Sequence, residues 1–325
     1  MKSVLIVTQK TDPHTDAVIE EIEKLKFNVL RLNSENLLDF YSIKMGYEEN
    51  ANFYGFISDK VGRNIDLKKT VSAYYRKPID VLPHPEIEID GAKEFSSLEG
   101  KIALSFVYTF PLMKWVNNPF LNKMAQIKFG QLHTASKLGL RIPETIVTNN
   151  PEEASIFFRK LNYNVLCKSL QTNSVQFNQK PVHTFSHKLD KEEQEKHLYN
   201  IRLAPTLLQE YIEKKTEIRV NVLGDKVFAT EIHSQSSDAG RHDWRKVNPW
   251  EVPHQPFDLP RKIEDALVRF VQLYGLKFGA IDLIRTHDDD FVFLENNPNG
   301  QWYWIELITK QPIAKAVAEL LCFGL

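Results

Sequence analysis

The N-terminal third of the chain alternates short apolar runs with stretches of helical periodicity. Val4 to Val7 is a continuous apolar run, which is typical of a strand buried on both faces. Apolar residues then recur at helical spacing at Ala17, Val18, Ile22 and Leu25. A second apolar run completes a predicted βαβ unit at Phe27 to Leu32. No glycine-rich turn follows the first strand, so the fingerprint of a dinucleotide site is missing.

The same pattern continues to a clear boundary near residue 117. A third strand is expected at Val71 to Arg76, followed by a long helix from about Ala92 to Met113. Asn118-Pro119 predicts the start of another helix, because asparagine caps helices and proline fits the first helical turn. We therefore expect a first domain of the α/β type at residues 1–117.

The rest of the chain predicts two more domains. The helix that starts at Pro119 is expected to end near Leu138, where Gly139 favours a C-terminal cap. Helix, strand and polar loop then alternate through residues 118–204. Strands dominate residues 205–325 until a closing helix at Ile313 to Leu321. The expected fold class is α/β and α+β.

Composition and charge exclude some classes of function. The chain has 325 residues, of which 42% are hydrophobic and 26% charged, as in an ordinary globular protein. Its formal net charge of −1 gives no global field that would recruit nucleic acid or an anionic membrane. Cys167 and Cys322 lack metal or disulfide spacing. The apolar stretch Val4 to Val7 is too short for a signal peptide or a spanning helix, so we expect neither at the N-terminus. We expect a cytoplasmic protein without nucleic-acid or membrane partners.

The strongest local signal is a pair of strands, Gly279 to Ile284 and Phe291 to Asn297, joined by a polar turn. With the turn centred between Asp288 and Asp289, antiparallel pairing places Asp282 opposite Glu295. Asn297 then shares the face of Glu295. Two carboxylates about 5 Å apart repel by about 3 kcal/mol at an effective dielectric of 20.

A divalent cation would relieve that repulsion. Two carboxylates and an amide are hard oxygen ligands, which suit Mg²⁺ better than zinc. The alternative is a half-exposed hairpin whose acids are solvated, which is the commoner case for an isolated pair.

Two lysines precede this hairpin in the chain. Lys128 interrupts the apolar stripe of its predicted helix, and Lys168 ends the strand Val165 to Cys167 before a polar loop. Both could neutralise phosphates. Both could equally be surface charges, with Lys128 extending its amine to water.

A polar strand face lies between these lysines and the acid pair. It follows the segment Gln209-Glu210-Tyr211-Ile212. Period-two alternation puts Glu217, Arg219 and Asn221 on one face of the next strand. Such a face is usually the solvent-exposed side of a sheet. Here it stands in the sequence between the two lysines and the acid pair, as a phosphate-binding site would need.

The ordered set resembles the nucleotide site of the ATP-grasp ligase superfamily. The match runs through Lys128, Lys168, Gln209-Glu210-Tyr211-Ile212, Glu217-Ile218-Arg219, Asp282 and Glu295-Asn296-Asn297. Further motifs resemble the microviridin-type ligases, or graspetide synthetases, over nearly the whole chain: Tyr74-Tyr75-Arg76, Asn118 to Thr145, Asp243-Trp244-Arg245-Lys246, Gly279 to Asp282 and Phe293 through Glu306. The resemblance implies an ATP-grasp fold, with central and C-terminal ATP-grasp domains behind the N-terminal domain.

The resemblance also implies roles for individual residues. Lys128 and Lys168 would contact nucleotide phosphates, the segment Gln209 to Ile212 would lie along the adenine, and Glu217 would hold the ribose. The backbone of Glu210 and Ile212, on either side of Tyr211, would read the adenine edge. Asp282, Glu295 and Asn297 would bind magnesium. Arg219 and Arg245 would stabilise the γ-phosphate and the acyl phosphate. One departure is that the polar stretch Ser169 to Pro181, where a phosphate loop is expected, contains no glycine.

The implied activity is that of an ADP-forming ligase dependent on ATP and Mg²⁺. It would activate side-chain carboxylates of a ribosomally made precursor peptide, with its leader, and form intramolecular esters or amides. The closer alternative is an ATP-grasp ligase that adds an amino acid to a protein terminus or makes a dipeptide. The more distant one is a non-catalytic binding module. The resemblance hints at a homodimer.

Overall fold

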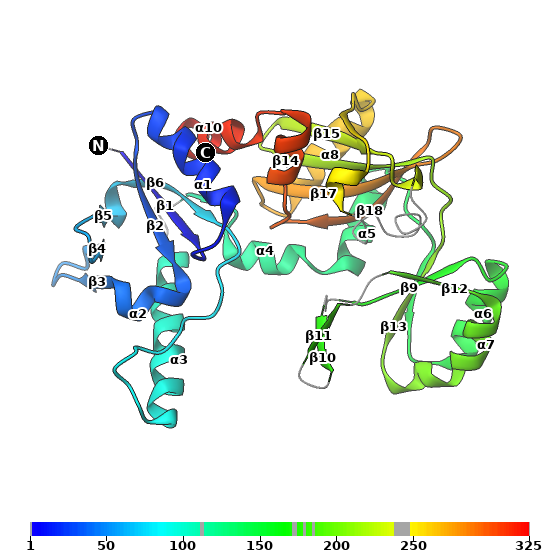
Figure 1. Ribbon diagram of the computed structural model, residues 1–325, viewed down its shortest axis with the longest axis horizontal. Coiled ribbons are helices and arrows are strands. Elements are labelled where there is room, and N and C mark those ends of the chain that lie inside the picture. Colours follow the sequence, from blue (N-terminus) through cyan, green and yellow to red (C-terminus); the bar gives the residue numbers. More distant parts are fainter. Residues whose placement is uncertain are drawn as a thin grey trace.

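The N-terminal sheet confirms the predicted βαβ unit. The computed structural model describes residues 2–110, 114–170, 174–177, 180–183, 186–236 and 248–324. Its first sheet is parallel, with the order β2 (Asn28–Asn33), β1 (Ser3–Thr8), β6 (Thr70–Tyr75) and β7 (Lys114–Val116) (Figure 1). Helix α1 (Pro13–Lys24) joins β1 to β2, and α3 (Asp90–Tyr108) precedes β7.

Strand β1 is buried on both faces, as its continuous apolar run predicts. Val4 and Ile6 face a core that includes Trp302 and Val317 from the C-terminal end of the chain. The alternate residues of β1 face a second core, closed by α3 and by the short helix α2 (Leu37–Phe40). That core also contacts a three-stranded antiparallel sheet of β3 (Tyr41–Tyr47), β4 (Phe53–Asp59) and β5 (Asn64–Asp66).

A second antiparallel sheet lies in the middle of the chain. Its order is β12 (His187–Leu189), β9 (Val165–Lys168), β13 (Thr206–Glu210) and β8 (Thr145–Thr148). Helices α6 (Pro151–Lys160) and α7 (Lys191–His197) lie beside it (Figure 1). A separate hairpin, β10 (Ser174–Phe177) and β11 (Lys180–His183), follows β9.

The third sheet has five strands and carries most of the candidate site. Its antiparallel order is β16 (His254–Pro256), β15 (Lys226–Ile232), β14 (Thr216–Leu223), β17 (Phe278–Arg285) and β18 (Phe291–Asn297). Helices α5 (Lys128–Lys137) and α8 (Arg261–Leu273) pack on one face. The opposite face meets α9 (Tyr303–Thr309) and α10 (Ile313–Phe323), and α10 packs on α1 and β6, so it joins the third sheet to the first.

The single helix predicted from Pro119 to Leu138 is wrong. The structure has two helices there, α4 (Pro119–Ala125) and α5, with Asn118 capping the first as predicted. The Gln131 side chain donates hydrogen bonds to the carbonyls of Ala125 (2.6 Å) and Asn296 (2.8 Å). It thereby satisfies a carbonyl at the end of α4 that a continuous helix would have used. As a result Lys128 opens α5 instead of interrupting an apolar stripe.

The closing helix is confirmed as α10, and Gly139 adopts the left-handed φ of +79° that favours glycine at a helix end. Strand β13, which begins after residue 205, pairs with β8 and β9, and α5 packs on β18. The division of the chain at residues 117 and 204 stays a prediction.

Candidate nucleotide and metal site

The acid pair of the β17–β18 hairpin is formed as predicted. Asp282 lies directly opposite Glu295. The turn, however, is centred at Asp288 and not between Asp288 and Asp289, because Leu283 pairs with Phe293 and the register shifts between Asp282 and Leu283. The predicted turn centre is therefore wrong, and a β-bulge in β18 restores the predicted pairing of the two acids.

A cation accompanies each acid. Arg219 on β14 lies opposite Asp282 on the neighbouring strand β17, and its guanidinium donates a hydrogen bond of 2.9 Å to the Asp282 carboxylate. Lys128 Nζ lies 3.6 Å from Glu295 Oε2. The side chains of Asp282 and Glu295 are only 15% and 24% exposed, so the four charges meet where water screens them weakly.

The third proposed metal ligand is less enclosed. Asn297 is exposed, lies two residues beyond Glu295 on β18, and its side-chain oxygen accepts a hydrogen bond from the Asn299 amide (3.0 Å). Among the described residues, no group of three or more His, Cys, Asp or Glu side chains could hold a metal ion. The candidate donor set is thus two carboxylates and an amide.

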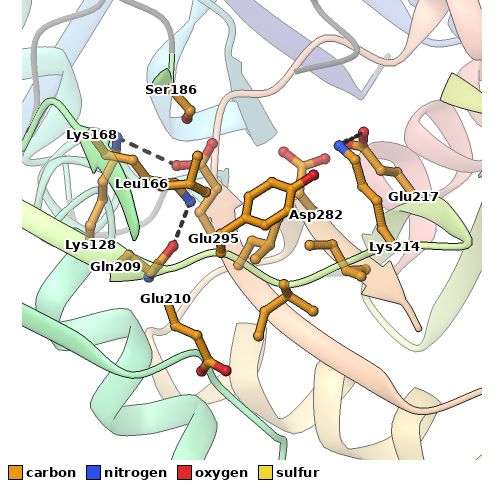
Figure 2. A pocket seen from close by; sticks show the side chains of 14 residues that line it. Lys128, Leu166, Lys168, Ser186, Gln209, Glu210, Lys214, Glu217, Asp282 and Glu295 are labelled. Atoms are coloured by element: carbon orange, nitrogen blue, oxygen red, sulfur yellow. Dashed lines mark hydrogen bonds and ion pairs between the residues drawn. The ribbon is translucent and has the colours of Figure 1, made fainter. Parts of the chain in front are cut away.

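The central and C-terminal sheets enclose a pocket around these acids (Figure 2). It brings together nine of the sequence-predicted site residues: Lys128, Lys168, Gln209, Glu210, Tyr211, Ile212, Glu217, Asp282 and Glu295. Leu166, Ser186, Lys214, Ile284 and Leu294 complete the lining. Arg219 lies beside the pocket through its bond to Asp282, and Asn297 does not line it. Arg245 lies outside the described residues.

The lysine side of the pocket is held by hydrogen bonds. Lys168 Nζ donates to Gln209 Oε1 (2.6 Å), and Gln209 Nε2 donates to Thr145 Oγ1 (2.9 Å). Gln209 is 2% exposed, so it fixes the direction of the Lys168 amine from beneath. Lys128 Nζ donates to the carbonyl of Ser169 (3.0 Å). The two amines therefore reach one space from a helix and a strand.

Lys214 is a site residue that the sequence analysis missed. It forms a buried ion pair with Glu217, and Ser234 Oγ donates a further hydrogen bond to Glu217 Oε1 (2.9 Å). In Figure 2 this pair lies at the opposite end of the pocket from Lys128 and Lys168. Lys214 and Lys215 look alike in the sequence, but Lys215 pairs with exposed Asp289.

The segment from Glu210 to Ile212, between the two ends of the pocket, offers backbone groups that could bind a ligand. The Glu210 amide donates to the carbonyl of Glu144 (2.8 Å), and the Tyr211 amide donates to the carbonyl of Asn164 (3.0 Å). The Lys188 amine lies 3.9 Å from the centre of the Tyr211 ring, in a cation–π contact. Since the Glu210 amide is engaged, the carbonyl of Glu210 and the amide of Ile212 are the backbone groups suited to an adenine edge.

A second, apolar cavity of about 540 Å³ shares Lys128 with this pocket. It is formed by α4, the start of α5 and Leu170, which follows β9. Its lining residues are Phe120, Lys123, Met124, Gln126, Ile127, Lys128, Phe129 and Leu170. A large apolar space therefore adjoins the charged pocket.

The RimK-like ATP-grasp domain family matches residues 125–321, so the chain belongs to this family of ATP-grasp enzymes. No curated protein matches the chain. The macrocyclase MdnC from Microcystis aeruginosa MRC, solved with precursor peptide MdnA, is 28% identical, with a TM-score of 0.84 over 98% of this chain and 99% of MdnC. A RiPP-associated ATP-grasp ligase from Chryseobacterium gregarium, solved with ADP and a leader and core peptide, is 27% identical. Its TM-score is 0.88 over 99% of this chain and 97% of that one.

Macrocyclase MdnB from Microcystis aeruginosa MRC is likewise 27% identical, with a TM-score of 0.78 over the full length of both chains. The ATP-grasp fold and the likeness to the graspetide synthetases, both predicted from the sequence, are confirmed. Within the described part of the chain, no helix combines the length and the apolar character needed to cross a membrane.

Proposed function

We propose that this ATP-grasp ligase activates side-chain carboxylates of a ribosomally made precursor peptide and closes intramolecular ester or amide bonds. The observation that carries the proposal is the meeting of Asp282 and Glu295 with Lys128 in one pocket, whose far end holds the Lys214–Glu217 pair. Acids for a metal and amines for phosphates thus lie at one end, as ATP-dependent phosphoryl transfer requires. The peptide class follows from the likeness to MdnC, MdnB and the Chryseobacterium ligase.

The nucleotide would lie along this pocket. Lys128 and Lys168 would neutralise phosphates, and the carbonyl of Glu210 and the amide of Ile212 would pair with the adenine edge. Glu217 has one oxygen bound to Lys214 and Ser234, so its other oxygen would accept the ribose hydroxyls.

Mg²⁺ fits the donor set on the hairpin. Asp282 and Glu295 supply carboxylate oxygens that face each other across two strands, and Asn297 adds an amide oxygen nearby. Bound there, the ion would offset negative charge on the phosphates during transfer. Arg219, which already touches Asp282, would hold the γ-phosphate, and Arg245 would do so for the acyl phosphate.

Activation is needed because a carboxylate is a poor acyl donor. Transfer of the γ-phosphoryl group to the carboxylate gives an acyl phosphate and ADP. A peptide hydroxyl or amine then attacks the acyl carbon, loses its proton, and phosphate leaves, which gives an ester or an amide. The chain's cations hold the phosphate charge during both steps.

The peptide needs a surface beside the phosphates. The apolar cavity that shares Lys128 with the nucleotide pocket supplies apolar area next to the reacting end. We propose that residues of the core peptide occupy it, and that the leader peptide binds elsewhere on the chain. The predicted domain limits, 1–117, 118–204 and 205–325, belong to this proposal, as does a cytoplasmic location.

We also propose a homodimer, formed through α3. This helix exposes Phe95, Leu98, Ile102 and Phe106 along one face while Gly100 and Leu104 face the core. Apolar faces of this kind are usually covered by a partner. Light scattering of the protein and of a Leu98→Glu/Ile102→Glu variant tests this: a dimer that the variant converts to a monomer supports the proposal, and a wild-type monomer contradicts it.

The alternative function is ligation of a free amino acid. Both functions use the same nucleotide site, so the acceptor distinguishes them. The test is ADP release with candidate acceptors: a precursor peptide encoded beside the gene, and the free amino acids. ADP formation that depends on the peptide alone supports the macrocyclase, whereas ADP formation with free amino acids supports the alternative. No ADP with either reactant contradicts both.

A further inference from the structure

Lys77 has an unusual backbone conformation at the end of β6. Its φ is +44°, in the left-handed region that residues other than glycine rarely adopt, and Pro78 follows it. Such strain persists only where the surrounding structure imposes it, and it gathers at functional sites.

The neighbour of Lys77 fixes it against the candidate metal hairpin. Arg76 is 2% exposed and donates hydrogen bonds to the backbone oxygen (2.9 Å) and side-chain oxygen (3.3 Å) of Asn299. Asn299 follows β18 and donates to Asn297 (3.0 Å). Lys77 therefore leaves the carboxyl end of a parallel sheet, where α/β folds bind ligands, at a point tied to the metal strand.

Positive charge is in excess at this point. The pKa of Lys77 is lowered to about 8, mainly by burial and also by the charges of Arg76 and Arg219, while Asp12 opposes them. Within the described part of the chain, Lys77 makes no hydrogen bond or ion pair. At neutral pH most of the amine is protonated, because the pH lies below its pKa.

The nearby acids have other partners. Asp12 accepts hydrogen bonds from Thr8 (2.9 Å) and Thr15 (2.8 Å) and contacts His14. Asp282 is bound by Arg219. A half-buried ammonium without a close carboxylate favours an anionic ligand.

His14 is not available to bind the anionic ligand. Its Nδ1 contacts Asp12 (3.1 Å) and its Nε2 accepts a hydrogen bond from the Trp302 amide (3.2 Å). Both ring nitrogens are engaged, so His14 joins the N-terminal sheet to the C-terminal part of the chain.

The position of Lys77 indicates which anion it binds. All residues that line the proposed nucleotide pocket come from residues 128–295, and the N-terminal sheet contributes none. Lys77 follows β6 of the N-terminal sheet instead, and it lies close enough to Arg219 for the charge of Arg219 to lower its pKa. Its ligand is then the second reactant, whose carboxylate must meet the γ-phosphate near Arg219.

We propose that Lys77 binds the carboxylate of the peptide side chain that is to be activated and positions it beside Arg219. This inference rests on the proposed function, since it assigns the acyl-donor subsite of the same ligase.

Competitive acetylation with acetic anhydride tests the contact directly. The probe is N-acetylglutamate methylamide, which presents one peptide-like carboxylate, with N-acetylglutamine methylamide as the uncharged control, both in Mg²⁺ and ADP. Peptide mass spectrometry follows Lys77 and Lys26, an exposed lysine that also has a left-handed φ (+62°). We expect the glutamate probe to slow acetylation of Lys77 severalfold and to leave Lys26 unchanged.

Three outcomes overturn the proposal: no protection by the glutamate probe, equal protection by the glutamine probe, or no acetylation of Lys77 even at pH 9. The assay needs no turnover. A protein that lacks peptide condensation but protects Lys77 would therefore refute the proposed function and leave the carboxylate contact standing.

Variants separate positioning from folding. Lys77→Met removes the charge at similar size, and we expect kcat/KM for the peptide to fall about tenfold to a hundredfold with an unchanged KM for ATP. Lys77→Arg should recover part of that loss. Lys26→Met is the matched control and should behave as wild type. An unchanged kcat/KM in Lys77→Met, or a loss accompanied by a lower unfolding midpoint and no rescue by arginine, contradicts the proposal.

Discussion

Replacing Glu295 by glutamine separates a metal ligand from a structural acid. The change keeps the shape and removes one charge. At an effective dielectric of 20, Glu295 gains about 4.6 kcal/mol from Lys128 at 3.6 Å. It loses about 3.3 kcal/mol to Asp282, which lies opposite at about 5 Å. Because these terms offset to a net of about 1.3 kcal/mol, Glu295→Gln should change the free energy of unfolding of the ligand-free protein by only about 1 kcal/mol.

With Mg²⁺ and ADP bound, the wild-type protein and Glu295→Gln should differ clearly in stability. Mg²⁺ and ADP at a hundred times their dissociation constant stabilise the wild-type protein by about 2.7 kcal/mol. In Glu295→Gln most of this stabilisation should vanish, because the phosphate charge loses a metal-holding carboxylate. Thermal unfolding with ADP and Mg²⁺, compared with ADP and EDTA, measures it. Asp288→Asn, an exposed acid in the turn of the same hairpin, is the matched control and should keep the full shift.

Retention of the full Mg²⁺-dependent shift in Glu295→Gln would refute the metal assignment. A ligand-free protein destabilised by several kcal/mol would instead show that Glu295 is structural, and would contradict the balance of charges described for Lys128 and Asp282.

Three further predictions follow from the site and its supports. Lys168→Ala should raise the KM for ATP about tenfold or more, and Gln209→Leu, which removes the acceptor 2.6 Å from the Lys168 amine, should raise this KM less. Steady-state ADP release measures both, and a wild-type KM in Lys168→Ala would show that the Lys168 amine does not contact the nucleotide. Glu217→Gln should lower the free energy of unfolding by about 3 kcal/mol, because Lys214 is left buried beside a neutral amide; a urea titration that shows no loss would contradict the buried pair. Burial lowers the pKa of His14 below its unfolded value, so on acidification the unfolded chain takes up a proton that the folded chain excludes, and stability should fall from pH 7 to pH 5; urea titrations of His14→Gln should show a weaker pH dependence, and an unchanged slope would count against this assignment.

Local sequence signals were enough to predict the acid pair. Two strands with a short polar turn fix which residues face each other, so Asp282 and Glu295 meet as expected, although a bulge and not the turn centre gives that pairing. The buried β1 strand and the cap at Asn118 are local in the same sense. Resemblance supplied what spacing could not, namely that distant lysines belong to one pocket.

Long-range contacts explain what was missed. The break between α4 and α5 depends on Gln131 reaching Asn296 on β18, which no local pattern encodes. Lys214 differs from Lys215 only in what surrounds it after folding. The position of Lys77 depends on Arg76 reaching Asn299. In each case a side chain is fixed by a partner more than a hundred residues away or by burial, neither of which the sequence displays.

The mass of the precursor peptide after reaction tests the central claim most directly. Incubated with the enzyme, ATP and Mg²⁺, the cognate precursor should lose one water for each bond formed, because an intramolecular condensation adds no atoms to the chain. Mild alkaline hydrolysis should restore the linear mass if the bond is an ester, the linkage we favour, and leave an amide ring closed. A gain in mass, or ligation of free amino acids in place of this loss, would contradict the macrocyclase account.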